Sequence, residues 1–426
     1  MVCSAVLTQA RAGCRRATAG RRLPAAARLL LAARFTRSVW QGSLVAAFAV
    51  YLERLQWRGE QIGALFAASF VVGAMLSLLV GPLSDRYGYR RLLIGYEAAI
   101  AALFVLATCS ANSLMISAAA VLGGFGRGAN GAPGCFVPAE LAWLAAVLPD
   151  RQRVATFSVN TAIGFAGMAL GAAIAAGPDL WTGWLSGPAA FRPVFAMGAV
   201  LALVNVGLLR LAPSAADGLP WAAADAVRPP MSGERKSLLV RVSAINVCNG
   251  ISVGLSGPLI AYWFAAKFAV GPLQIGPVML VGFVSAALCA LAVRGTVARA
   301  AGASVYIRLQ WMSLLLMLLM PLSASFAVAA ALWVVKFGLE RGSSGAMEAV
   351  NVGLAGRGRW GLASGLSVAS MAMPRSIGPV MAGHWISTAA FAVPFLTAGL
   401  LQAAYLLLYR RAVLPMSRLS AERASP

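Results

Sequence analysis

The chain has 426 residues, of which 60% are hydrophobic and 11% are charged, and its formal net charge is +22. Because about a quarter of the residues of a soluble domain are charged, this composition excludes an ordinary soluble protein. The positive charge does not indicate nucleic-acid binding, since most Lys and Arg residues fall in alternate loops between apolar runs and form no single patch.

The N-terminal stretch, residues 1–34, contains seven arginines and no acidic residue. We interpret it as a basic cytoplasmic tail. Two alternatives stay open at this point: an organellar transit peptide, which is also Arg-rich and acid-poor, and an over-extended start of the reading frame. A cleaved secretory signal is excluded, because the apolar run that follows is long enough to span a membrane.

Twelve apolar runs follow, and each approaches the length of about twenty residues that crosses a bilayer as a helix. The first six are expected at residues 35–52, 61–83, 91–110, 113–136, 154–176 and 191–211. A polar, proline-containing linker at 212–237 separates them from six more, at 238–265, 272–294, 303–323, 326–350, 361–386 and 391–409. The sequence therefore predicts an all-α integral membrane protein with a bundle over 35–211, a second bundle over 238–410 and a tail over 411–426.

The distribution of Lys and Arg predicts the orientation. With both termini on the cytoplasmic side, most of the 35 basic residues fall in cytoplasmic loops or at the cytoplasmic ends of spans. The positive-inside rule requires this bias. We therefore expect a multi-pass protein of the cell membrane with both termini in the cytoplasm.

The turn between the second and third spans reads Gly81-Pro-Leu-Ser-Asp85-Arg86-Tyr-Gly88-Tyr-Arg90-Arg91. Its glycines permit close backbone approaches, and a carboxylate such as Asp85 sits favourably near a helix N-terminus. The stretch resembles the G-x-x-x-D-R-x-G-R-R signature of the major facilitator superfamily of secondary transporters, with Tyr89 in place of one arginine. The resemblance implies two pseudo-symmetric six-helix bundles and a gating role for Gly81, Asp85, Arg86, Gly88, Arg90 and Arg91.

An internal repeat supports two duplicated halves. The hexapeptide that begins at Arg127 (RGANGA) recurs at Arg341 (RGSSGA), and the glycines of the turn recur weakly at Gly295 and Gly302. Both matches have the same offset, because 341 − 127 and 295 − 81 equal 214. Parallel repeats of this kind place a substrate site between the halves, near the middle of the membrane.

The fourth span carries Arg127 and Asn130, which resemble the family's R-x-x-Q-G signature with Asn in the Gln position. An arginine inside a span costs about 2.5–3.5 kcal/mol on insertion scales, so it needs a partner or a cavity. The resemblance implies proton coupling for Arg127 and a cavity position for Asn130. The structural alternative is that Arg127 bonds nearby carbonyls and stabilises a glycine-rich helix crossing.

The tenth span is the most polar, with Lys336, Glu340, Arg341 and Glu348. A carboxyl in a membrane cavity can act as a proton switch, so Glu340 is the first candidate and Glu348 the second. The alternative is a buried ion pair, such as the i, i+4 pair Lys336–Glu340, that only holds helices together. We expect Glu97 in the third span to form a structural pair.

Other polar residues in the spans are candidates for lining a substrate cavity. Basic groups outnumber acids among them, which favours anionic or neutral substrates. Asn246 and Asn249 form a one-sided stripe, although helix-to-helix hydrogen bonds would give the same pattern. The complete set of cavity candidates is Gln41, Asn130, Asn246, Asn249, Lys336, Arg341 and Arg375.

No residue pattern indicates an enzyme, a metal site or a cofactor. The six cysteines form no C-x-x-C pair, and His384 is the single histidine. There is no phosphate-binding loop ending in Lys-Ser/Thr and no G-x-S-x-G elbow. Uphill transport would therefore depend on an ion gradient or on exchange.

The function that the resemblance implies is secondary active transport by alternating access. We expect a monomer in the lipid bilayer that couples efflux of a small organic molecule to protons. Uptake or exchange of an anionic metabolite is the alternative, because the Gly-Pro signature of exporters occurs in span 11 (Gly378-Pro379) instead of span 5. A non-transporting membrane sensor or partner subunit is a third possibility.

Overall fold

The computed structural model describes residues 23–110, 112–127, 134, 136–148, 150–181, 183–213, 233–296, 302–343 and 370–422. Every regular element in these ranges is a helix. Eight of the helices in the described part are long and apolar enough to cross a membrane. The predicted all-α membrane class is therefore confirmed.

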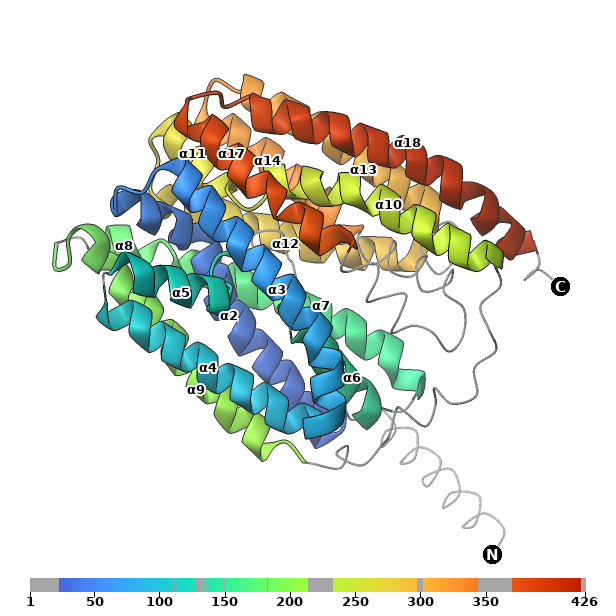
Figure 1. Ribbon diagram of the computed structural model, residues 1–426, viewed down its shortest axis with the longest axis horizontal. Helices are drawn as coiled ribbons and strands as arrows, with labels where there is room; N and C mark the ends of the chain where they lie inside the picture. Colours follow the sequence, from blue (N-terminus) through green and yellow to red (C-terminus); the bar gives the residue numbers. More distant parts are fainter. Residues whose placement is uncertain are drawn as a thin grey trace, which may run out of the picture.

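The helices form two halves that lie one above the other in Figure 1. The N-half comprises α2 (Ala25–Arg54), α3 (Gly59–Tyr87), α4 (Tyr89–Cys109), α5 (Ser113–Gly123), α6 (Val137–Val147), α7 (Asp150–Ile174), the short α8 (Gly177–Leu180) and α9 (Arg192–Leu211). The C-half comprises α10 (Gly233–Ser256), α11 (Ile260–Phe268), α12 (Pro272–Thr296), α13 (Gly302–Leu319), α14 (Phe326–Gly342), α17 (Ile377–Ser387) and α18 (Val393–Glu422). Most of the predicted linker, residues 214–232, lies outside the described ranges.

Helix positions repeat along the chain much as the sequence motifs do. Helices α3, α4 and α5 begin at residues 59, 89 and 113, and α12, α13 and α14 begin at 272, 302 and 326. Each pair of starts differs by 213 (272 − 59, 302 − 89 and 326 − 113), within one residue of the offset of the repeated motifs.

The turn predicted over residues 81–91 is almost entirely helical. Helix α3 continues to Tyr87, α4 begins at Tyr89, and Gly88 alone separates them with φ = 82°. A positive φ costs a glycine little, and this is why the chain can reverse direction at one residue. The side chains of Asp85 and Arg86 lie outside the described part.

The prediction of one continuous helix over 113–136 is wrong. Helix α5 ends at Gly123, and Gly124 and Gly126 both have positive φ angles, 70° and 75°. Left-handed glycines are the usual way to end a helix, so this glycine-rich stretch divides the span. The seventh span is divided as well, since Gly257, Pro258 and Leu259 separate α10 from α11.

The first helix starts earlier than predicted. Helix α2 begins at Ala25 instead of residue 35, because residues 25–33 are mostly Ala and Leu, which favour helix. The tail predicted over 1–34 therefore ends in helical residues. This extension moves Arg37 from the expected helix end into the interior of a 30-residue helix.

The two halves meet closely at one end of the molecule, which we call the contact end. It is the end where α2 and α7 finish and where α3 and α12 begin (Figure 1). A Cβ placed on Gly63 of α3 would lie 2.1 Å from the Pro379 carbonyl oxygen of α17. On the other side of the interface, a Cβ on Gly276 of α12 would lie 2.6 Å from the Ala172 carbonyl oxygen of α7.

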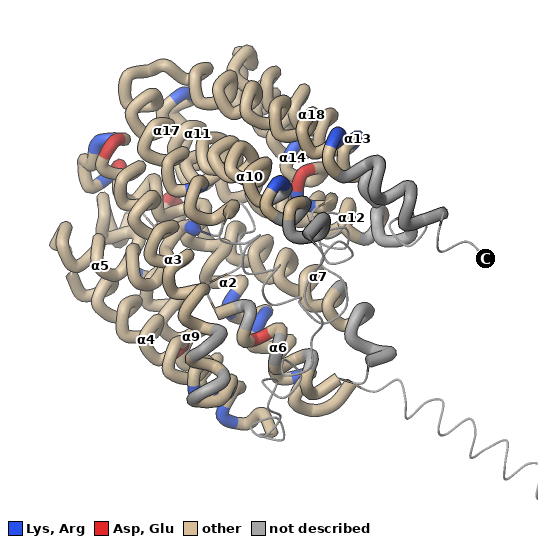
Figure 2. Tube along the Cα trace, turned by 45° about the vertical axis from the view of Figure 1, so that its right-hand side comes forward, with Lys and Arg blue, Asp and Glu red and all other residues tan. Residues whose placement is uncertain are grey.

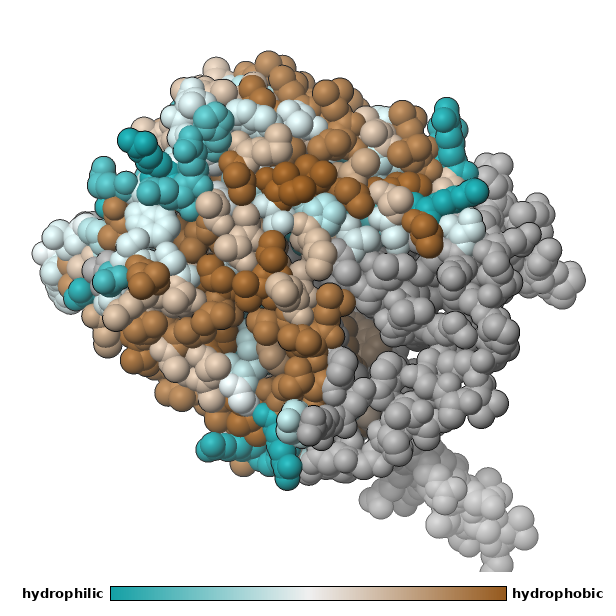
Figure 3. Space-filling view, viewed as in Figure 1, coloured by the Kyte–Doolittle hydropathy of each residue, from teal (hydrophilic) through white to brown (hydrophobic). Residues whose placement is uncertain are grey.

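The outward faces of the helices are strongly apolar. Figure 3 shows hydrophobic residues across the middle of one face and hydrophilic residues gathered toward its ends. Large side chains such as Leu114, Leu203 and Leu400 are 76%, 58% and 75% exposed. Apolar side chains exposed over so large an area are suited to contact with lipid.

Candidate functional site

Charged residues in the helices gather in two interior places. Figure 2 shows acidic and basic positions together beside α6 in the N-half and beside α14 in the C-half. Charges away from water are rare because their desolvation is costly, so each group requires partners. We describe the C-half cluster first, since it contains most of the predicted site residues.

The C-half cluster centres on the Glu340 carboxylate of α14. Lys336 Nζ lies 2.5 Å from Glu340 Oε2, and Arg341 Nη2 lies 2.8 Å from Glu340 Oε1. The predicted i, i+4 pair of Lys336 with Glu340 is therefore present. Two cations on one carboxylate stabilise its negative charge, and this arrangement does not favour a group that must gain and lose a proton.

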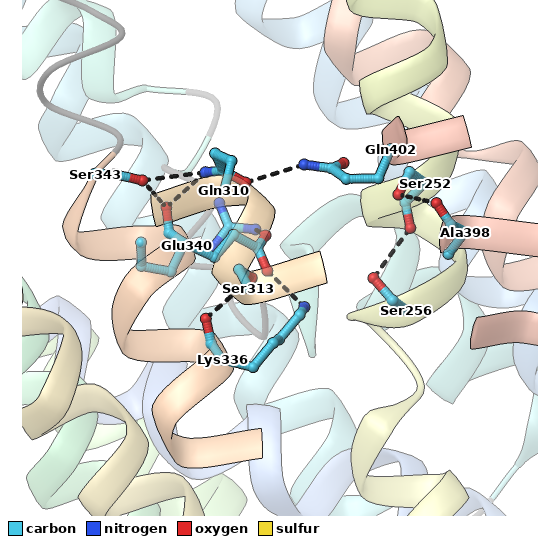
Figure 4. Close-up of polar contacts among 10 residues, drawn as sticks. Ser252, Ser256, Gln310, Ser313, Lys336, Glu340, Ser343, Ala398 and Gln402 are labelled. Atoms are coloured by element: carbon cyan, nitrogen blue, oxygen red, sulfur yellow. Dashed lines mark hydrogen bonds and ion pairs between the residues drawn. The ribbon is translucent and has the colours of Figure 1, made fainter. Parts of the chain in front are cut away.

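Neutral polar side chains extend the cluster toward α13 and α18 (Figure 4). Gln310 of α13 donates through Nε2 to Ser343 Oγ at 3.1 Å and to the Glu340 carbonyl at 3.3 Å. Gln402 of α18 donates to Gln310 Oε1 at 3.0 Å. Sequence reasoning missed both glutamines, although each is a polar residue in an otherwise apolar run.

Arg375 adds a third positive charge to this region. It is 9% exposed, its Nε is buried without a hydrogen-bond partner, and it interacts electrostatically with Glu340 and Arg341. The carboxylate near it is already in contact with Lys336 and Arg341. A bound anion would supply the acceptor that the Arg375 Nε lacks.

The predicted polar stripe on α10 is buried and partly used for helix packing. Ser252, one turn after Asn249, donates to the Ala398 carbonyl of α18 at 2.8 Å, and this is a helix-to-helix hydrogen bond of the kind that the structural alternative predicts. Asn246 donates to Ser370 Oγ at 3.5 Å, and its Oδ1 is buried without a partner. Asn249 is 5% exposed. Their role in substrate binding stays a prediction.

The remaining cavity candidates belong to the N-half or lie outside the described residues. Gln41 of α2 is buried and its Oε1 has no hydrogen-bond partner. A Cβ on Gly134 would lie 3.5 Å from Gln41 Nε2, so this side chain faces the interrupted fourth span. Asn130 and Glu348 lie outside the described residues.

Arg127 follows the break in the fourth span and reaches across to α3. Its Nη1 donates to the Ser69 carbonyl at 3.1 Å. A Cβ added to Gly73 or to Gly124 would overlap its guanidinium, so both glycines make room for this side chain. The contact is the one that the structural alternative predicts, and proton coupling by Arg127 stays a prediction.

The sequence predicted a structural pair for Glu97, but it did not indicate the N-half cluster to which Glu97 belongs. Arg37 of α2 binds Glu97 of α4 with 2.5 Å between Nε and Oε1, and its Nη1 also pairs with Glu140 of α6. Asn205 of α9 donates to Glu97 Oε2 at 3.3 Å. A second signal was Glu140, the single acid in the apolar run 137–148.

Comparisons with known proteins agree with this architecture. Residues 29–245 match the family model described as Major Facilitator Superfamily. No curated protein sequence matches the chain significantly.

Solved structures resemble the chain in fold at low sequence identity. A point mutant of the nucleoside transporter NupG aligns with a TM-score of 0.71 and 11% identity, covering 91% of this chain and 99% of that one. The human organic anion transporter MFSD10 (TETRAN) aligns with a TM-score of 0.64 and 17% identity, covering 91% and 100%. Since the family model spans half of the chain, the chain belongs to the major facilitator superfamily of transporters.

Proposed function

We propose that the chain is a secondary active transporter that works by alternating access and couples the efflux of a small organic anion to protons. The observation that carries the substrate class is the buried Arg375 guanidinium at the C-half cluster. Its Nε has no hydrogen-bond partner, and the nearby Glu340 carboxylate is already held by Lys336 and Arg341. An anionic group in reach of the Arg375 guanidinium would gain charge-assisted hydrogen bonds there.

We place both termini on the cytoplasmic side of the cell membrane, as the positive-inside rule favours. The contact end then faces outward, and the described conformation is closed to the outside. The bundles 35–211 and 238–410 would rock about this interface, with the linker 212–237 between them, and the motif at Gly81–Arg91 would act at the inner end. We expect a monomer to be sufficient for transport.

Uptake or exchange of an anionic metabolite is the second candidate. The same cations serve an anion moving in either direction, so the C-half cluster does not distinguish import from export. Among the structural neighbours, one is named as an organic anion transporter and another as a nucleoside transporter. Both names are compatible with a polar or anionic solute.

Thermal unfolding of the purified protein with a panel of organic anions, cations and neutral solutes tests the substrate class. A ligand at 100 times its Kd stabilises a protein by about 2.7 kcal/mol. We expect one or more anions to raise the melting temperature of the wild type but not of Arg375→Gln. Arg58→Gln is the matched control, because Arg58 is exposed before α3 and distant in sequence from the C-half cluster.

Two outcomes would contradict the proposal. The first is stabilisation only by cations or neutral solutes. The second is an anion whose stabilising effect is the same in Arg375→Gln as in the wild type. Transport direction is then measured with everted membrane vesicles, in which an exporter accumulates the stabilising anion and an importer does not.

A further inference from the structure

Arg37 lies between two carboxylates in the interior of the N-half. The residue is 1% exposed, and Glu97 and Glu140 are also buried, with 0% and 2% exposure. Glu97 is the ninth residue of α4, which places it about 12 Å along that helix at 1.5 Å per residue. The three charged groups come from three helices, α2, α4 and α6.

The groups in direct contact do not balance in charge. Arg37 pairs through Nε with Glu97 and through Nη1 with Glu140, and its Nη2 is buried without a hydrogen-bond partner. One guanidinium therefore holds two carboxylates, with one negative charge in excess. Two carboxylates that share one buried site do not both remain ionised easily, because each raises the cost of charging the other.

Other groups face this cluster from each neighbouring helix. Arg34, one turn earlier on α2, attracts Glu140 and repels Arg37, but no ion pair joins it to either carboxylate in the described residues. Tyr96 of α4 interacts electrostatically with Arg37. The neutral Asn205 of α9 donates to Glu97 and accepts from Thr36 of α2. Among these described groups, Glu97 and Glu140 are the only acids.

We propose that Glu97 and Glu140 together bind one proton on the Arg37 guanidinium, and that this pair is the proton site of the transporter. The inference rests on the proposed proton-coupled function. The proton adds to one carboxylate oxygen and forms a neutral carboxyl. The three contacting groups then change from a net charge of −1 to 0. We treat the pair as a unit, because strongly interacting carboxyls titrate jointly.

The arrangement connects protonation to the interface between the halves. Protonation removes one of the two ion pairs that tie α2 to α4 and α6. Helix α2 also packs across the interface against α11 and α12. Glu340 offers no such change, since two cations hold its single carboxylate.

Infrared spectroscopy of the purified protein in lipid nanodiscs tests this site without a substrate. A pH titration of the wild type is expected to show the carbonyl stretching band of one buried, protonated carboxyl. Glu97→Gln and Glu140→Gln should each abolish the band, because each leaves a balanced pair of Arg37 with one carboxylate. Glu60→Gln is the control, since Glu60 is exposed at the contact end and should leave the band unchanged.

If the protein with a Glu substitution does not fold, a second variant tests the same site. Arg34→Gln removes the positive charge that faces Glu140 from one turn away, and it leaves both carboxyls in place. Less positive charge near the pair favours the protonated form, so the midpoint of the infrared band should move to higher pH. An unchanged midpoint would contradict the placement of the proton on this pair.

The proposal is overturned if the band is absent from the wild type, or if it persists in both Glu97→Gln and Glu140→Gln. A band that disappears in Glu340→Gln and not in the N-half variants would assign the proton to the C-half cluster instead. Because no solute is present, this result is independent of the thermal panel. A failure of anion binding and a failure of the proton site can therefore be told apart.

Discussion

Substitution of Gly63 by Ala should disfavour the conformation in which the contact end is closed. The added Cβ would lie 2.1 Å from the Pro379 carbonyl oxygen, whereas real Cβ contacts essentially never fall below 3.0 Å. Helices α3 and α17 would therefore have to separate by about 0.9 Å at this point (3.0 − 2.1). Overpacking of this kind costs about 1–3 kcal/mol, which changes a two-state equilibrium by about 5- to 150-fold.

Double electron–electron resonance measures this shift directly. Spin labels are placed at Trp184 and Leu322 in a variant that lacks the native cysteines. These residues are 93% and 77% exposed, and they report on the N-half and C-half sides of the contact end. We expect the wild type to populate mainly the short distance and Gly63→Ala to add a longer one. Gly207→Ala is the matched control, because a Cβ on Gly207 meets no atom within 4 Å.

The control also removes the effect of helix propensity, since Ala is favoured over Gly in any helix by about 1 kcal/mol. If Gly63→Ala and Gly207→Ala both give the wild-type distance distribution, close packing at the contact end does not set the conformational equilibrium.

Three further predictions concern charged residues. Asp179→Asn should increase the population of the longer spin-label distance several-fold in the same assay. Asp179 pairs with Arg54 at 2.6 Å and accepts from the Leu273 amide of the C-half at 2.8 Å, so its loss weakens the contact end. A wild-type distance distribution would contradict this. Glu340→Gln should destabilise the protein by about 3–5 kcal/mol in chemical or thermal unfolding, since it leaves buried cations without their carboxylate; an unchanged stability would show that these cations have other partners. Asp85→Asn should impair transport flux while the melting temperature stays the same, and normal flux would exclude a gating role for the motif.

Much of the fold could be predicted because its signals are local. Apolar runs of membrane-spanning length gave the order of the helices, and α9 begins at Arg192, one residue from the predicted start at 191. The pair of Lys336 with Glu340 was also accessible, since residues four apart in a helix share a face.

The features that sequence reasoning missed depend on long-range contacts or on backbone angles. Glu140 lies 103 residues from Arg37 in the chain, so nothing local indicates that they are partners. The apolar run over 113–136 has a suitable composition for one helix, but the positive φ angles of Gly124 and Gly126 divide it. Glycine permits positive φ angles without requiring them. The sequence alone therefore did not distinguish a continuous helix, whose glycines allow a neighbouring helix to pack closely, from a helix that ends at these glycines.

Proton movement in proteoliposomes that contain the purified protein tests whether it couples the transport of an organic anion to protons. A pH gradient is imposed, organic anions, cations and neutral solutes are added in turn, and an internal dye reports the pH in the lumen. We predict that one class of organic anion dissipates the gradient with the wild-type protein, and that it does so neither with Arg375→Gln nor in protein-free liposomes. Dissipation by cations alone, or by no solute of the panel, would contradict proton-coupled transport of an organic anion.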